Sequence, residues 1–262
     1  MNLNLIGKHA FVCGSTQGIG KAAAIELASM GATITLIARN EDALKQTLAE
    51  LDNSQQQKHD YLVADFSNPQ LLKEKADAYI KAHGPINILI NNTGGPAGGP
   101  IINAKPEDFT DTFTRHLLCN HLLAQSVIEG MKSSGYGRII NVISTSVKQP
   151  IKGLGVSNTI RAAVGNWSKT LSFELAPFGI TVNNVLPGAT LTVRLSSILE
   201  AKAAKTCITL DEAKKEMMAE IPAARFAQPA EIANAIAFLA SPAAAYITGI
   251  NIPVDGGRTA CL

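Results

Sequence analysis

The stretch SNTIR, residues 157–161, places a serine and an arginine four residues apart, just ahead of an apolar run with helical periodicity. Residues four apart share one face of a helix, so Ser157 and Arg161 would point to the same side. A guanidinium keeps its proton, so Arg161 can hold hydroxyl groups and stabilise a developing oxyanion, but it cannot act as a general acid. The Ser157 hydroxyl can relay a proton, yet it does not titrate near neutral pH.

Two titratable side chains, Lys148 and His116, are candidates for moving a proton. Lys148 lies four residues beyond Ser144, in the loop after the predicted strand 138–143, where the carboxyl end of a parallel strand faces ligands. Desolvation there would lower the pKa of a lysine toward neutrality, and the alternative is a solvated loop charge. His116 titrates near neutral pH without much tuning, and the alternative for it is a structural histidine between helices.

A glycine-rich loop, VCGSTQGIG at 12–20, follows the first predicted strand and opens the first predicted helix. Gly14, Gly18 and Gly20 let the backbone approach a phosphate closely, while the helix N-terminus offers free N–H groups and the positive end of its dipole. Because strand, loop and helix follow one another in the order that this mechanism needs, the stretch predicts a nucleotide-binding site.

The end of the second predicted strand indicates which nucleotide is bound. An acidic residue there would bind the ribose 2′-hydroxyl of NAD(H). Here Ala38 is followed by Arg39, and an arginine pairs with a 2′-phosphate through charge-assisted hydrogen bonds. We expect the Ser15 hydroxyl to bind the same phosphate. The sequence therefore favours NADP(H) over NAD(H), with a solvated loop charge as the alternative for Arg39.

Short β-rich runs alternate with longer helical patterns along the chain. Apolar strands separated by helices predict a doubly wound α/β fold, with a seven-stranded parallel sheet covered on both faces, as a single domain over residues 1–262. A polar helical insertion at about 189–222 follows the sixth strand and is expected to cover a ligand, the alternative being a packing excursion. The expected strands are 9–13, 33–38, 61–65, 86–92, 138–143, 180–186 and 250–255, and the expected helices are 18–30, 41–51, 68–83, 106–133, 155–176 and 229–240.

Composition narrows the classes of partner. A formal net charge of +2 over 262 residues is too small to argue for nucleic acid or a membrane surface, which leaves a small-molecule substrate. The four cysteines have no metal-ligand spacing, so we expect no metal site and interpret Cys13 and Cys119 as core residues. The chain starts without a signal-peptide pattern and has no run of 18 apolar residues, so we expect a cytoplasmic protein.

The spacing Gly-x-x-x-Gly-x-Gly resembles the cofactor loop of the short-chain dehydrogenase/reductase (SDR) family, although Cys13 replaces the usual Thr. NNTG at 91–94 resembles the family's Asn-Asn-Ala-Gly, PGATLT at 187–192 its Pro-Gly motif beside the nicotinamide, and RFAQPAEIANAIAFLASPAAAYITG…VDGG its C-terminal signature. The resemblance implies a Rossmann-like fold in which Asp65 contacts the adenine ring. The cofactor-binding residues that it implies are Gly14, Ser15, Gly18, Ile19, Gly20, Arg39, Asp65, Phe66, Asn92, Gly94, Pro187, Gly188 and Thr192.

The same resemblance assigns the catalytic positions. SDR enzymes use a Ser, a Tyr, a Lys four residues after the Tyr, and an Asn on the preceding long helix. Aligned on GRIINVIS and AAVGNWSKTLSFEL, this chain has Ser144 at the serine, Ser157 at the tyrosine, Arg161 at the lysine and His116 at the asparagine. It therefore resembles a divergent member without the Tyr-x-x-x-Lys dyad, which keeps the positive charge but not the titratable acid. Lys148 and His116 are the candidates to replace that acid.

The resemblance implies an NADP(H)-dependent oxidoreductase that acts on a carbonyl or alcohol by hydride transfer, similar to 3-oxoacyl-carrier-protein reductases. The missing dyad leaves two alternatives open: an inactive dinucleotide-binding or regulatory protein, and a non-redox reaction on the same scaffold. Relatives imply a homotetramer or homodimer, for which Trp167, Leu171 and Leu175 are candidate contacts. The Gly- and Pro-rich loop 93–100 either lets substrate approach the nicotinamide or merely connects two elements.

Overall fold

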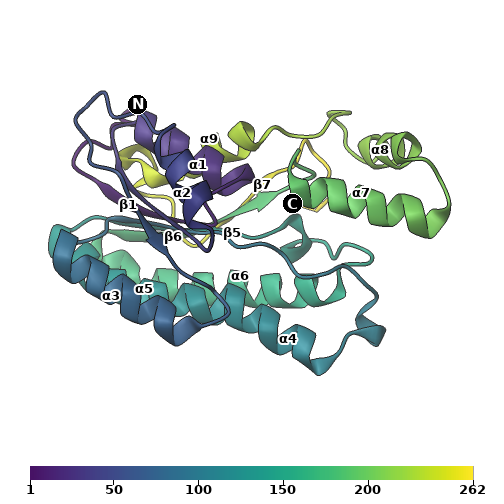
Figure 1. Cartoon of the computed structure of the whole chain (residues 1–262), viewed down its shortest axis with the longest axis horizontal. Helices are drawn as coiled ribbons and strands as arrows, with labels where there is room; N and C mark the ends of the chain where they lie inside the picture. Colours follow the sequence, from purple (N-terminus) through teal and green to yellow (C-terminus); the bar gives the residue numbers. More distant parts are fainter. Residues whose placement is uncertain (262) are drawn as a thin grey trace.

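The fold is one parallel sheet with helices on both faces, seen in a computed structural model that describes residues 1–261 (Figure 1). The strand order is β3-β2-β1-β4-β5-β6-β7, and every neighbouring pair is parallel. This confirms the predicted doubly wound, seven-stranded sheet. The strands are β1 (His9–Cys13), β2 (Thr33–Ala38), β3 (Asp60–Val63), β4 (Ile88–Asn91), β5 (Gly137–Val142), β6 (Ile180–Pro187) and β7 (Asn251–Val254).

Figure 1 shows two helical layers and a projecting pair of helices. One layer contains α1 (Gly18–Ser29), α2 (Glu41–Leu48) and α9 (Pro229–Ala240). The opposite layer contains α3 (Pro69–His83), α4 (Pro106–Phe113), α5 (Cys119–Ser134) and α6 (Gly155–Leu175). The pair α7 (Val193–Thr206) and α8 (Leu210–Ala219) follows β6 and extends beyond the sheet.

Alternate residues of the strands supply two separate apolar cores. Leu36 and Ile90 face α1 and α9, where they pack with Leu27 and Ile236. The other core joins Leu89 and Cys13 of the strands to side chains of α3 and α5, among them Cys119, and both cysteines are fully buried as predicted. Each fully buried aliphatic side chain contributes about 1.5–3 kcal/mol, so both faces of the sheet are fixed by burial.

The main departure from the expected elements is the helix predicted over 106–133. It is interrupted by a π-helical turn, η2 (Thr114–Leu118), which separates α4 from α5. A π turn adds one residue to the hydrogen-bonded ring, and apolar periodicity alone does not reveal it. The insertion 189–222 is likewise two helices, because Cys207 adopts a left-handed conformation and Thr209 opens a new capping box.

The candidate subunit contacts on α6, Trp167, Leu171 and Leu175, are mostly covered within the chain. Leu175 is buried, and Trp167 and Leu171 pack partly against the core, so the exposed large apolar side chain of α6 is Phe173, at 69 % exposure. The homotetramer or homodimer stays a prediction. None of the helices within residues 1–261 has both the length and the apolar composition that crossing a membrane requires.

A row of asparagines ties four neighbouring strands together. Asn91, Asn141, Asn184 and Asn251 are register partners on β4 to β7. Their side-chain amides are joined by hydrogen bonds of 2.9, 2.9 and 2.8 Å, and Asn141 also donates to Ser168 on α6. Asn141 is fully buried, so its amide is held entirely by protein partners. The row therefore fixes the register of β4, β5, β6 and β7 relative to one another.

We predict that Asn141→Leu lowers the free energy of unfolding by about 2–4 kcal/mol, because it leaves buried polar groups of Asn91 and Asn184 without partners. Urea denaturation of the purified protein measures the change. Asn251→Ala, on the edge strand β7, serves as the control and should cost about 1 kcal/mol. Equal effects of the two substitutions would show that the row does not act as a buried network.

Candidate functional site

The candidate site lies where the carboxyl ends of β1, β4, β5 and β6 open into loops. These strands are neighbours in the sheet, so their loops meet at one edge. That edge is where doubly wound folds bind ligands. Residues 1–261 hold no group of three or more His, Cys, Asp and Glu side chains that could bind a metal ion.

The glycine loop after β1 is closely packed. A Cβ on Gly20 would lie 2.2 Å from the Gly14 carbonyl oxygen, and one on Gly14 would lie 2.6 Å from the Asn92 carbonyl oxygen. Gly14 and Gly18 also have φ of 59° and 55°, a region that side chains rarely adopt. Asn92 donates from Nδ2 to the carbonyl of Cys13 at 3.2 Å, which joins the ends of β1 and β4. Only glycine fits these positions.

The groups around this loop fit a dinucleotide diphosphate. Ser15 is fully buried, and its hydroxyl has no hydrogen-bond partner anywhere in residues 1–261. The N-cap residue of α1, Gln17, makes no side-chain capping bond, so N–H groups at Gly18 and Ile19 remain available. Open space surrounds the position where Gly94 would carry a side chain. Phosphate oxygens would satisfy these donors.

The predicted adenine end carries Asp65, Phe66 and Arg39 at the ends of β3 and β2. A hydrogen bond from the Ser67 backbone N–H lowers the pKa of the Asp65 carboxyl, and the charges of Arg39 and Arg115 lower it further. Phe66 is buried, whereas Arg39 is exposed. The Arg39 charge therefore acts on the Asp65 carboxylate, while the roles predicted for both residues in cofactor binding stay predictions.

The Pro-Gly motif after β6 is also tightly fitted. A Cβ on Gly188, which follows Pro187, would lie 2.7 Å from the Asp255 Cα. Thr192 caps α7, because its hydroxyl accepts a hydrogen bond from the Leu195 N–H at 3.4 Å. The Thr192 methyl group lies 3.1 Å from where a Gly18 side chain would begin. The start of α7 therefore lies directly against the glycine loop.

Arg161 and Ser144 lie at the end of β5, and Ser157 precedes Arg161 by one helical turn on α6. Ser144 lies two residues after the end of this strand and accepts a hydrogen bond from the Ser146 N–H at 3.1 Å. Arg161 donates from Nη1 to the carbonyl of Val142 at 2.7 Å, which ties α6 to the strand end. Ser157 lies one turn earlier on α6 and is buried, and its hydroxyl bonds to no other residue in the described chain.

His116 lies in the π turn and is buried. Its Nδ1 lies 2.7 Å from the Thr93 hydroxyl. Burial lowers the pKa of His116 well below its usual range, and the positive charges of Arg161, Arg115 and Arg194 lower it further. The imidazole is therefore neutral at physiological pH, which differs from the unshifted histidine expected from the sequence. As a neutral ring it can relay a proton but holds no spare one.

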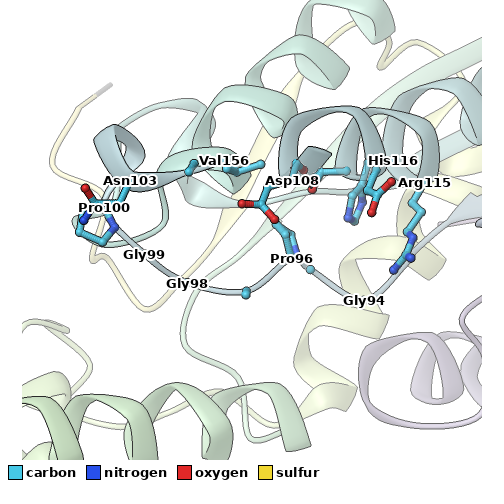
Figure 2. Close-up of a pocket in the computed structure, with 15 residues that line it drawn as sticks. Gly94, Pro96, Gly98, Gly99, Pro100, Asn103, Asp108, Arg115, His116 and Val156 are labelled. Carbon is cyan, nitrogen blue, oxygen red and sulfur yellow. Dashed lines mark hydrogen bonds between the residues drawn. The ribbon is translucent and has the colours of Figure 1, made fainter. Parts of the chain in front are cut away.

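A cavity of about 410 Å³ lies along the Gly- and Pro-rich loop after β4. Figure 2 shows the loop passing the helical segment that carries Asp108, Arg115 and His116, whose side chains point toward it. The loop thus forms a wall of the cavity as well as a connection. Lys148 is half-buried and does not line this cavity, while its carbonyl accepts a weak hydrogen bond from the Cys261 thiol at 3.7 Å.

The sequence reasoning missed Arg194, in the first turn of α7. Its Nη2 donates to the carbonyl of Pro96 at 2.6 Å. A Cβ on Gly95 would lie 3.5 Å from Arg194 Nη2 and 3.7 Å from Arg161 Nη2, so the two guanidiniums approach one point. A signal was present in the sequence, because a cation in the first turn of a helix opposes the dipole and is a local conflict typical of functional sites.

Comparisons with known proteins identify the same architecture. The family model described as "Enoyl-(Acyl carrier protein) reductase" matches residues 14–259. The 3-oxoacyl-acyl-carrier-protein reductase FabG of Vibrio cholerae is 34 % identical over 256 residues, covering 97 % of this chain and 98 % of that protein. The NADPH-dependent reductase BacG of Bacillus subtilis is 33 % identical over 251 residues, covering 95 % of this chain and 97 % of that protein.

A solved structure extends the likeness to three dimensions. L-sorbose reductase from Gluconobacter frateurii, in complex with NADPH and L-sorbose, superposes with a TM-score of 0.93 at 30 % identity, and 100 % of each chain is covered. The matched residues include both the glycine loop and the segment after β6. The chain therefore belongs to the short-chain dehydrogenase/reductase family of NAD(P)-dependent reductases and dehydrogenases.

Proposed function

We propose that this protein is an NADP(H)-dependent oxidoreductase that reduces a carbonyl or oxidises an alcohol, with 3-oxoacyl compounds as first candidates. The observation that supports the proposal is that the residues of the glycine loop and the residues at the end of β5 lie at the same edge of the sheet. Ser15 and the glycine loop fit a dinucleotide, and Ser144 and Arg161 converge on the end of β5 beside it. NADPH-dependent reductases among the relatives support the choice of cofactor.

The residues that replace the family dyad give the proposed site an unusual chemistry. NADP(H) would supply or accept a hydride at its nicotinamide ring. Ser144 would donate a hydrogen bond to the substrate oxygen, and Arg161 would stabilise negative charge that develops there. Burial and the nearby charge of Arg194 lower the pKa of Arg161 to about 10, so the guanidinium remains charged at neutral pH. Neither Ser157 nor Arg161 is a general acid near neutral pH.

We place the proton route on neutral groups. Solvent would be the proton source, and Ser157 or the Thr93–His116 pair would pass the proton inward, because each carries both a donor and an acceptor. Lys148 is the weaker candidate, since it lies outside the cavity that His116 lines. In the proposal, α7 and α8 form the cover that the sequence predicts at 189–222, and Thr192 holds its first turn against the cofactor loop.

A dinucleotide-binding protein without catalysis is the second candidate function. The replacement of a tyrosine by Ser157 favours it, because a serine hydroxyl is a poor acid. Non-redox chemistry on the same scaffold is the third. The cavity beside His116 favours the enzyme, because a protein that only binds a dinucleotide does not need a second cavity for a substrate.

The enzyme and the binding protein differ in turnover. We expect oxidation of NADPH, followed by its absorbance, with at least one member of a panel of ketones and 3-oxoacyl thioesters. Tight NADPH binding without turnover on the whole panel would contradict the oxidoreductase and support the binding protein. Ser144→Ala should lower kcat about 10²–10³-fold if Ser144 hydrogen-bonds the reacting oxygen.

We predict that Arg39→Ala weakens NADPH binding by about 10–100-fold, because it removes a charge-assisted contact to the 2′-phosphate. NADH lacks that phosphate, so its affinity should change less than about 3-fold. Fluorescence titration of the wild type and of the variant with each cofactor measures the affinities. Equal losses for NADPH and NADH would show that Arg39 does not read the 2′-phosphate.

A further inference from the structure

Two arginines at the edge of the cavity lack acidic partners. Within residues 1–261, no ion pair joins either Arg161 or Arg194 to a carboxylate. Each makes one hydrogen bond, to the carbonyl of Val142 and of Pro96 respectively. A guanidinium carries several N–H donors, so both retain donors for another group. Arg161 is only 8 % exposed, and a buried charge without a counter-charge is costly.

The two arginines reach one point from different elements. Arg161 comes from α6, and Arg194 comes from the first turn of α7. Both Nη2 atoms lie within 3.7 Å of the position where a Gly95 side chain would begin. Gly95 also lines the 410 Å³ cavity, so the shared point lies at the wall of that cavity. Because Gly95 has no side chain, both guanidinium groups can be reached from the cavity.

The surrounding charges favour an anion at this point. Arg115 and His116 line the same cavity, and the imidazole is neutral. Asp108 and Asp111 line it from α4, but Asp108 caps that helix through the Lys105 N–H, and both carboxylates are exposed. They therefore compensate neither of the two arginines. The phosphates of a bound cofactor have donors elsewhere, at the glycine loop.

We propose that Arg161 and Arg194 bind an oxyanion group of the substrate, a carboxylate or a phosphate, beside its reacting carbonyl. That the anion belongs to the substrate rests on the proposed function, whereas the anion site itself depends only on binding. Arg194 determines specificity, because a fork from α7 pairs with the anion only when that helix lies against the loop after β4. Paired, fork-shaped contacts suit both oxyanions.

Binding measurements on the NADP⁺ complex test the proposal without requiring turnover. The probes are acetoacetate with its methyl ester, and dihydroxyacetone phosphate with dihydroxyacetone, titrated by calorimetry. We expect at least one charged probe to bind about 10-fold or more tightly than its neutral partner, and the pair that shows this identifies the oxyanion. Because NADP⁺ is present, a site already filled by cofactor phosphates would show no preference, which would overturn the inference.

Substitutions on α7 test whether Arg194 causes the preference for the charged probe. Arg194→Gln should reduce the charged-to-neutral affinity ratio about 10-fold or more, and Arg194→Lys should reduce it less because the charge remains. Lys205→Gln removes an exposed charge from the same helix and should leave the ratio unchanged. A ratio that survives Arg194→Gln would overturn the inference. An anion preference without NADPH oxidation would contradict the proposed enzyme but not the anion site.

Discussion

The buried positive charge of Arg161 is the constraint around which the site is arranged. Its guanidinium is anchored to the Val142 carbonyl and faces Arg194 instead of a carboxylate. The same charge helps to keep His116 neutral. Burial and the positive charge of Arg194 lower the pKa of Arg161 only to about 10. A permanent cation thus occupies the sheet edge, and the surrounding groups are suited to stabilise negative charge rather than to donate protons.

This arrangement depends on how precisely the strand ends are held. The asparagine row from Asn91 to Asn251 aligns β4 to β7, and Asn92 joins β4 to the glycine loop after β1. The close approach of Gly20 to Gly14 leaves the loop little freedom. Rigid strand ends therefore present the cofactor loop, Ser144 and the loop after β4 at one edge, while the charged forks reach them from α6 and α7.

Local patterns predicted much of the fold because strands β1 and β2 are short apolar runs bounded by loops, and burial on both faces makes their ends easy to place. The glycine loop was equally readable, since Gly14 and Gly20 meet steric limits that no other residue satisfies. The π turn around His116 could not be predicted, because an added residue in one turn leaves the apolar pattern nearly unchanged.

The convergence of Arg161 with Arg194 could not be predicted either, because it joins residues 33 positions apart through a tertiary contact at Gly95. Likewise, the pKa of His116 follows from burial and neighbouring arginines, which a sequence does not display.

If Arg161 and Arg194 bind a ligand anion, the buried charge of Arg161 serves that ligand and not the stability of the fold. Arg161→Met tests it directly, because methionine fills similar space without the desolvation cost. We expect the free energy of unfolding of the ligand-free variant, from urea denaturation, to lie within about 1 kcal/mol of the wild type or above it. The stabilisation by NADPH together with an anion should be smaller in the variant. A loss of about 3 kcal/mol or more in the ligand-free variant would show that Arg161 is a structural element, and would contradict the account.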